Sequence, residues 1–366
     1  MSFLILSPQS CVRALSVNSA CLHCETSCPV NAIVISERLP SINQSQCVGC
    51  GGCVAVCPTE ALKLDDFDPN ELFFSLVSQD EIILSCQKNV PCLASMSPEQ
   101  LIALAQLKGD IVCDIGHCHQ CAIGEKVLHH FYPMIEDVNY LLEATQCSSQ
   151  VLTKEIAYKE EELGVEVGRR DFFKTFHLKK IGSIKGDFEK EVQKSTDEFV
   201  TYTTDSSHTA LLRAKKITDR RKLFFTAIKR SSEPTIFHVV DSTKMSFTSQ
   251  KLLDESKCTA CQMCYRICPT AALSSDVRNS KIDFDPFLCI KCHLCHDVCE
   301  TDAITLSSSY NLKEWYAPTV QNLVTYLVRP CDECGGLFSS VAGEKICRRC
   351  QLEEEEALEL WGLNEK

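Results

Sequence analysis

The spacing of apolar residues predicts alternating helices and strands between residues 71 and 150. Residues 71–78 (ELFFSLVS) have the pattern of a short amphipathic helix, and residues 81–86 (EIILSC) that of a buried strand. Pro98 is expected to open a helix with one apolar face, and residues 109–116 (GDIVCDIG) form a second expected strand. A longer helix is expected from about Ile123. This order of elements predicts a small parallel sheet.

The next segment, residues 151–247, has no cysteine and carries more than half of the chain's 37 Lys and Arg. Between Arg213 and Arg230, basic and apolar residues alternate so that a helix there would have a basic and an apolar face. We favour a solvated connecting helix packed on a neighbouring domain. The alternative is a docking surface for an acidic partner subunit or for anionic lipid headgroups. The polar residues 201–209 are expected to form a flexible break.

The chain has 26 cysteines, and most of them lie in repeated runs. Three runs read C-x2-C-x2-C-x3-C, and a fourth lacks only its leading cysteine, where Asn18 stands. The complete runs are Cys47, Cys50, Cys53 and Cys57; Cys258, Cys261, Cys264 and Cys268; and Cys289, Cys292, Cys295 and Cys299; the incomplete run is Cys21, Cys24 and Cys28. An alanine and an aliphatic residue follow each run at the same distance: Ala32-Ile33, Ala61-Leu62, Ala272-Leu273 and Ala303-Ile304. Such self-similarity is typical of duplicated supersecondary units.

These two pairs of runs resemble the dicluster ferredoxins of bacteria. There, three cysteines of one run and the last cysteine of its neighbour hold each [4Fe–4S] cluster. The resemblance implies four ligand sets: Cys11, Cys21, Cys24 and Cys57 for cluster one; Cys47, Cys50, Cys53 and Cys28 for cluster two; Cys258, Cys261, Cys264 and Cys299 for cluster three; Cys289, Cys292, Cys295 and Cys268 for cluster four. Cys11 is assigned to the missing leading position, displaced upstream by a loop over residues 12–20. The alternative is a three-cysteine site, such as a [3Fe–4S] centre, with Cys11 only a small buried hydrophobe.

Cysteines also gather in the expected α/β segment, at Cys86, Cys92, Cys113, Cys118 and Cys121. They follow or end the two expected strands, where α/β sheets place ligands. The layout resembles the small [2Fe–2S] subunits that deliver electrons between hydrogenases and disulfide reductases. Three interpretations remain open: a fifth iron–sulfur cluster or other metal centre on Cys86, Cys92, Cys118 and Cys121, a zinc site, or a docking module with free thiols. His117 and His119 flank Cys118, either as substitute ligands or as exposed loop residues.

Near the end of the chain, Cys331, Cys334, Cys347 and Cys350 read C-x2-C-x12-C-x2-C. Two such knuckles predict a zinc ribbon with a tetrahedral four-thiolate site, and rubredoxin-type mononuclear iron is the alternative. The acidic residues 354–366 are expected to form a solvated helix with Trp361 as its apolar anchor.

Length, charge and composition narrow the function classes. Long chains rich in cysteine but without a signal peptide are more typical of metal ligation in a reducing cytoplasm than of disulfides. Arg169–Lys174 looks like a twin-arginine export signal but has no apolar core after it, and no stretch is long enough to span a membrane. A net charge of −12 disfavours nucleic acid as a partner. No nucleotide-binding or catalytic motif is present.

The sequence therefore predicts an α+β protein with six parts. They are two ferredoxin-like dicluster domains at 1–70 and 248–310, a small α/β module at 71–150, a charged, mostly helical linker at 151–247, a zinc-ribbon-like module at 325–353 and an acidic tail at 354–366. The expected function is relay of single electrons between redox proteins, as subunit or partner of a larger oxidoreductase such as a hydrogenase or formate dehydrogenase. Two alternatives are a redox enzyme subunit with its chemistry at 78–150, and an iron–sulfur assembly or sensor factor. Peripheral contact with a membrane is compatible with the basic segment.

Overall fold

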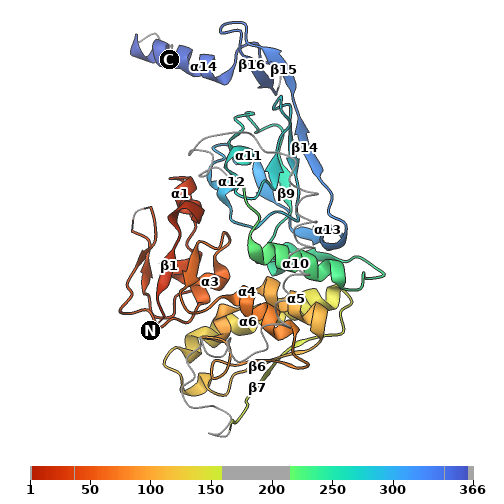
Figure 1. Ribbon diagram of the computed structural model, residues 1–366. Helices are drawn as coiled ribbons and strands as arrows, with labels where there is room; N and C mark the ends of the chain where they lie inside the picture. Colours follow the sequence, from red (N-terminus) through yellow and green to blue (C-terminus); the bar gives the residue numbers. More distant parts are fainter. Residues whose placement is uncertain (1, 37, 159–214, 342, 362–366) are drawn as a thin grey trace.

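The computed structural model describes residues 2–36, 38–158, 215–341 and 343–361. The expected break at 201–209 and the motif at 169–174 lie outside these residues. Figure 1 shows the N-terminal cysteine-rich region beside an α/β module, with the second cysteine-rich region above and helix α10 (Asp219–Arg230) between them. The mixture of short helices and strands agrees with the predicted α+β class. Every helix in the described part of the chain is too short or too polar to cross a lipid bilayer.

The first cysteine-rich region is built from two short antiparallel strand pairs, β1 with β4 and β2 with β3. Its elements are β1 (Leu4–Leu6), the 3-10 helix η1 (Pro8–Ser10), α1 (Val12–Leu15), α2 (His23–Thr26), β2 (Ile33–Val34), β3 (Ser41–Ile42), α3 (Gly52–Val56) and β4 (Leu62–Leu64). The aliphatic residues that follow the cysteine runs, Ile33 and Leu62, are buried in these strands. The repeated sequence tail therefore supplies the local core.

The α/β module has three parallel strands in the order β5-β6-β7. Its elements are α4 (Pro69–Val77), β5 (Ile82–Leu84), η2 (Leu93–Ser95), α5 (Pro98–Lys108), β6 (Ile111–Asp114), η3 (Cys118–Gln120), α6 (Gly124–Ala144) and β7 (Val151–Lys154). Helix α5 begins with a capping box, in which Ser97 and Gln100 satisfy each other's backbone N–H groups. Strand β7 lies beyond the expected boundary at residue 150, because only Val151 and Leu152 signal it in the sequence.

The second cysteine-rich region extends on both sides of the expected range 248–310. Strand β8 pairs with β13, β9 pairs with β12, and β10, β11 and β14 form an antiparallel sheet. The elements are β8 (Val239–Asp241), η4 (Ser242–Lys244), β9 (Lys251–Leu253), α11 (Met263–Ile267), β10 (Leu273–Ser274), β11 (Lys281–Phe284), α12 (Leu294–Asp297), β12 (Ile304–Leu306), β13 (Ser309–Asn311), α13 (Lys313–Tyr316) and β14 (Gln321–Thr325). Strands β8 and β14 lie outside the cysteine repeats but pair with β13 and β11, so the domain is larger than the sequence predicts.

Helix α10 corrects the expectation of a solvated basic helix. Arg220 and Arg221 are buried, as are Phe224 and Phe225 on the same helix. The Phe224 ring meets the Trp315 ring edge-to-face at a centroid distance of 4.9 Å. Two guanidiniums can lie inside the protein because each finds acceptors there, including the carboxylate of Glu99. The helix is therefore part of the interior between the modules.

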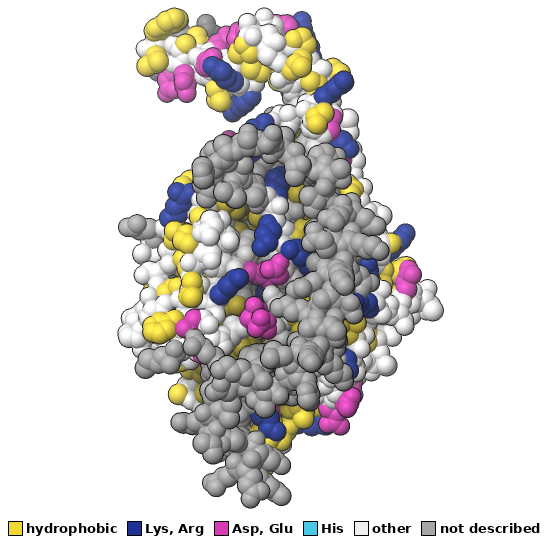
Figure 2. All heavy atoms as spheres, in the orientation of Figure 1, with side chains coloured by type: hydrophobic (Ala, Val, Ile, Leu, Met, Phe, Trp, Pro, Cys, Tyr) yellow, Lys and Arg dark blue, Asp and Glu magenta, His cyan; other side chains and the backbone are white. Residues whose placement is uncertain are grey.

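The last part of the chain projects from the body of the molecule (Figure 2). It contains the hairpin of β15 (Leu327–Pro330) and β16 (Leu337–Ser340), followed by α14 (Arg348–Leu360). The expected boundary between residues 353 and 354 falls inside α14, because the second cysteine pair starts the same helix that carries the acidic residues. Trp361 is 75% exposed, so it is not an anchor in this structure.

Candidate metal centres

The three complete cysteine runs share one backbone conformation. In each run, residues on both sides of the second cysteine have positive φ: Gly49 and Gly51, Ala260 and Gln262, Lys291 and His293. Left-handed backbone at non-glycine residues costs free energy and persists where the surrounding structure requires it. The incomplete run departs from this pattern, since Leu22, after Cys21, has a φ of −126°. The backbone therefore differs where Asn18 replaces the leading cysteine.

The tails of all four runs also share a conformation. The third residue after each last cysteine has positive φ: Asn31, Glu60, Ala271 and Asp302. The backbone N–H of the next residue donates to the cysteine Sγ in three runs, from Ala32 to Cys28 at 3.1 Å, from Ala61 to Cys57 at 3.2 Å and from Ala303 to Cys299 at 3.2 Å. In the remaining run Leu273 donates to Cys268 at 3.5 Å. Hydrogen bonds to sulfur are one of the means by which proteins set iron–sulfur potentials.

The structure brings Cys11 together with Cys21, Cys24 and Cys57. All four line one cavity, with Leu6 and Pro40 among its walls. Burial, together with the neighbouring thiols of Cys57, Cys21 and Cys11, raises the pKa of the Cys24 thiol to about 12. Cys11 immediately precedes α1, so the displaced loop returns this side chain to the run that lacks a leading cysteine.

Cys28, Cys47, Cys50 and Cys53 form the next group. Burial raises the pKa of the Cys53 thiol, and the thiols of Cys50, Cys47 and Cys28 add to the rise. Cys24 of the first group contributes as well, so the two groups are neighbours. Helix α3 carries Cys53 and follows the left-handed Gly51, which turns the chain around the site.

In the second cysteine-rich region, burial raises the pKa of the Cys264 thiol, with Cys261, Cys295 and Cys258 as the thiols that add to it. Burial raises the pKa of Cys292, with Cys268, Cys289 and Cys295 beside it. Cys258, Cys261 and Cys264 thus gather in one group, and Cys268, Cys289, Cys292 and Cys295 in another. Assignment of Cys299 to the former group stays a prediction.

Two side chains that the sequence did not single out contact these cysteines. The hydroxyl of Tyr326 lies 2.9 Å from Cys258 Sγ, and that of Ser249 lies 3.4 Å from Cys289 Sγ. Tyr326 is 68 residues from Cys258, beyond the reach of any local motif. A hydroxyl that donates to a ligand sulfur would stabilise the reduced form of a cluster held there, because that form carries more negative charge.

The grouped thiols fit [4Fe–4S] clusters. All-cysteine ligation is typical of these clusters; the predicted ligand cysteines are buried or half-buried except for the exposed Cys261, and the last cysteine of each run accepts a backbone N–H group. When bound, such clusters accept and donate single electrons. Because burial raises the pKa of these thiols, binding a cluster there would displace protons.

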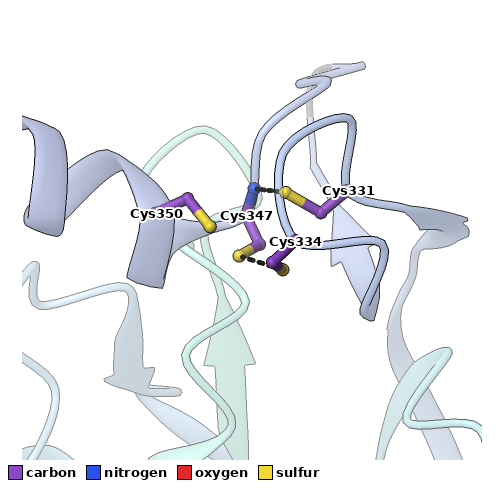
Figure 3. Close-up of side chains that lie close together, drawn as sticks. All are labelled: Cys331, Cys334, Cys347 and Cys350. Atoms are coloured by element: carbon purple, nitrogen blue, oxygen red, sulfur yellow. Dashed lines mark hydrogen bonds between the residues drawn. The ribbon is translucent and has the colours of Figure 1, made fainter.

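The C-terminal cysteines form a tighter group. Among the described residues, Cys331, Cys334, Cys347 and Cys350 are the set of three or more candidate ligand atoms that all lie within 4.8 Å of one another. Figure 3 shows their side chains converging from the β15–β16 hairpin and the start of α14. The sulfur atoms of Cys334 and Cys347 are 3.8 Å apart. A tetrahedral ion with metal–sulfur bonds of about 2.3 Å requires about the same separation.

Cys331 is prepared for metal binding by its backbone surroundings. Hydrogen bonds from the backbone of Cys334 and Cys347 lower the pKa of its thiol to about 6. The N–H of Cys347 donates to Cys331 Sγ at 3.2 Å. These hydrogen bonds favour the thiolate, which is the form that binds metal.

In the α/β module, Cys113 is fully buried within β6, so its side chain belongs to the sheet core. Burial raises the pKa of the Cys118 thiol, and the nearby thiols of Cys86, Cys92 and Cys121 add to the rise. His119 is half-exposed and lies 3.3 Å from Glu155, which agrees with the loop interpretation of this histidine.

The family matches to known proteins fall on the two regions that contain the cysteine repeats. Residues 19–61 and 244–304 each match a family described as "4Fe-4S dicluster domain". The chain is 48% identical over 44 residues to a subunit of the ion-translocating oxidoreductase complex of Methanosarcina acetivorans, covering 12% of this chain and 17% of that protein. It is 38% identical over 56 residues to the ferredoxin-type protein NapF of Haemophilus influenzae, covering 14% and 32%.

The chain thus spans less than two thirds of the length of these two relatives. A third relative, Ferredoxin-3 of Chlorobaculum tepidum, is 44% identical over 48 residues, which are 12% of this chain and 77% of that ferredoxin. The predicted tandem repeats are confirmed, and the chain belongs to the dicluster [4Fe–4S] ferredoxin family.

Proposed function

We propose that this protein carries four [4Fe–4S] clusters and relays single electrons between redox partner proteins, as a subunit or partner of a larger oxidoreductase complex. The observation that carries the proposal is the direct contact between the two ferredoxin regions. The backbone N–H of Ala20, next to Cys21, donates to the Asp297 carboxylate of α12 at 3.1 Å. Cluster one and the second ferredoxin region are therefore neighbours.

Electrostatics support the same contact. Burial lowers the pKa of His23, next to Cys24, and the Lys291 ammonium beside it lowers it further. Lys291 lies between Cys289 and Cys292, two of the predicted ligands of cluster four. The clusters then follow one another in space as three, four, one and two, because clusters three and four share a domain, as do clusters one and two.

The relatives suggest the setting. One is named as a subunit of an ion-translocating oxidoreductase complex, and another as a ferredoxin-type protein. We infer that the partners of this chain are redox proteins of comparable complexes, in a cytoplasm that keeps its 26 cysteines reduced. The C-terminal four-cysteine site would hold zinc and stabilise the projecting arm.

Anaerobic iron and sulfide analysis tests the cluster count. Four cubane clusters contribute about 16 iron and about 16 sulfide ions per chain. A total near eight would contradict the proposal. Co-purification with a larger dehydrogenase would support the relay over a free-standing enzyme.

Electron passage requires a second experiment. A Cys21→Ser/Cys24→Ser variant should lose cluster one, which lies between the second ferredoxin region and cluster two in the proposed relay. Electrons given to the second domain should then reach cluster two more slowly than in the wild type, as followed by freeze-quench EPR. The matched control is Cys147→Ser, since Cys147 belongs to none of the predicted sets. Equal transfer rates in the variant and the wild type would contradict the relay.

A further inference from the structure

The parallel sheet of the α/β module delivers four cysteines to one edge. Strands β5 and β6 run side by side with Leu84 opposite Cys113, so both end at the same place. Cys86 follows the end of β5; after β6, Cys118 begins η3 and Cys121 directly follows it. Cys92 immediately precedes η2. Loops beyond the carboxyl ends of parallel strands are where α/β folds bind ligands.

Buried hydrogen bonds fix the loops that carry these cysteines. Ser85 donates its hydroxyl to Asp114 Oδ2 at 2.8 Å, which joins the end of β5 to the end of β6. Asp114 Oδ1 accepts the N–H groups of Gly116 at 3.0 Å and Ile156 at 3.1 Å. Both carboxylate oxygens of Asp114 already accept hydrogen bonds. Asp114 therefore holds the two loops in place and is not proposed as a metal ligand.

A glycine holds the second pair of cysteines against α6. A Cβ at Gly124 would come within 1.8 Å of the Cys118 carbonyl oxygen. Only glycine therefore allows α6 to begin in contact with the Cys118–Cys121 turn. Helix α6 packs against η2 as well as η3, so Cys92, which precedes η2, and the Cys118–Cys121 turn lie beside the same helix.

The size of the group favours a polynuclear centre over a single ion. In the part of the chain that the structure describes, no three sulfurs of the α/β module all lie within 4.8 Å of one another, and the same holds for the ferredoxin sets. A tetrahedral zinc ion needs sulfurs about 3.8 Å apart, whereas an iron–sulfur core places several atoms between its ligands.

Two more glycines bring these four cysteines next to the predicted cysteine ligands of cluster two. A Cβ at Gly51 would lie 2.8 Å from Ser95 Cβ, and one at Gly52 would lie 3.5 Å from Ala94 Cβ and 3.8 Å from Cys50 Sγ. The other complete runs carry side chains at the corresponding positions, Gln262 and Met263 in one and His293 and Leu294 in the other. Gln262 and His293 adopt the same left-handed conformation as Gly51. The glycine at 51 therefore serves close approach of η2 more than backbone conformation.

We propose that Cys86, Cys92, Cys118 and Cys121 hold a fifth iron–sulfur centre, which exchanges electrons with the cluster held by Cys28, Cys47, Cys50 and Cys53. The exchange rests on the proposed relay function, whereas metal binding by the four cysteines does not. A single electron passes from the reduced cluster to the oxidised fifth centre, and no bond forms or breaks. A redox protein at either end of the path supplies or removes that electron.

The packing of the two segments agrees with the close approach. Helix α3, which carries Cys53, packs against η2, which Cys92 immediately precedes. The path through the protein then runs from the second ferredoxin domain through the first into the α/β module.

Iron, sulfide and zinc analysis of full-length, anaerobically purified protein tests the site. The Cys86→Ser/Cys92→Ser variant should lose about two to four iron ions and equal sulfide relative to the wild type, retaining about 16 of each. The control Cys113→Ala/Cys147→Ser removes two cysteines outside the site and should retain all of them. Unchanged iron in the first variant, or loss of zinc in place of iron, would overturn the fifth centre. Retained iron near eight in that variant would instead contradict the four-cluster proposal.

Gly51→Gln tests the electron contact without removing a ligand. It introduces the residue found at position 262 and must push Ser95 away from the Cys50 loop. We expect unchanged iron content, weaker magnetic coupling in EPR spectra of the reduced protein and slower electron arrival at the fifth centre. The control is Gly343→Gln, whose φ is +87° and whose Cβ would meet no atom within 4 Å. Wild-type coupling and rate in Gly51→Gln would overturn the electron contact.

Discussion

Glu99 and Arg221 form an ion pair inside the protein, with 2.8 Å between Glu99 Oε1 and Arg221 Nε and both side chains at most 5% exposed. Arg220 pairs with the other carboxylate oxygen at 2.9 Å. Arg220 also donates to the Cys57 carbonyl of the first ferredoxin region, and Arg221 to the Phe247 carbonyl of the second. One carboxylate in α5 therefore joins all three modules.

Replacement of Glu99 by Gln should weaken this junction strongly. Two buried guanidiniums would lose their counter-ion, and removal of one partner from a buried pair costs about 3–5 kcal/mol. Anaerobic urea unfolding of Glu99→Gln and wild-type protein measures the difference. Asp137→Asn is the control, because Asp137 pairs with Lys244 at the same 2.8 Å but with side chains 30% and 46% exposed. Its cost should be at most about 1 kcal/mol, and equal losses in both variants would contradict the role of Glu99.

Cys11→Ser should alter cluster one and leave the other clusters intact. Cys11 lines the same cavity as Cys21, Cys24 and Cys57, so its loss leaves three cysteine ligands there. We expect about one iron fewer per chain and an EPR signal typical of a [3Fe–4S] centre in the oxidised protein. Cys147→Ser serves as the control. Spectra identical to the wild type would remove Cys11 from the ligand set.

The C-terminal site should contain about one zinc per chain, released by Cys334→Ser or by a strong chelator. Loss of the ion should expose the β15–β16 hairpin to proteases, since the four cysteines join this hairpin to the start of α14. Iron and sulfide should remain bound, because the arm projects from the body that contains the ferredoxin regions (Figure 2). Loss of one iron in place of zinc from Cys334→Ser would identify the alternative, rubredoxin-type metal.

Tyr326→Phe should lower the potential of cluster three. The hydroxyl 2.9 Å from Cys258 Sγ would no longer stabilise the charge of the reduced state. A potentiometric titration followed by EPR measures the shift. Tyr265→Phe removes a hydroxyl that donates to Asn279 Oδ1 at 2.9 Å and not to a sulfur, and should leave the potential unchanged. An equal shift in the two variants would mean that the sulfur contact has no specific effect.

The sequence predicts best what is local. The tails of the cysteine runs recur within a few residues, and the structure gives all four the same left-handed turn. Helix α10 could not be predicted as an interior helix, because the partners of Arg221 lie 122 residues away at Glu99 and 66 away at Phe287. Its basic residues look solvated when only their own helix is considered. Strand β7 escaped prediction for a related reason: two apolar residues become a strand only because β6 offers an edge.

The contacts of Glu60 join residues that are synthesised at different times. The Glu60 carboxylate accepts the N–H groups of Asp219 and Arg220, both at 2.9 Å, and so caps α10 from 159 residues earlier in the chain. At ribosomal speeds of about 5–20 residues per second, roughly 10–30 s separate the synthesis of these partners. Arg220, which donates to the Cys57 carbonyl, is made only after that interval, so the first ferredoxin region acquires its contacts with α10 late in synthesis.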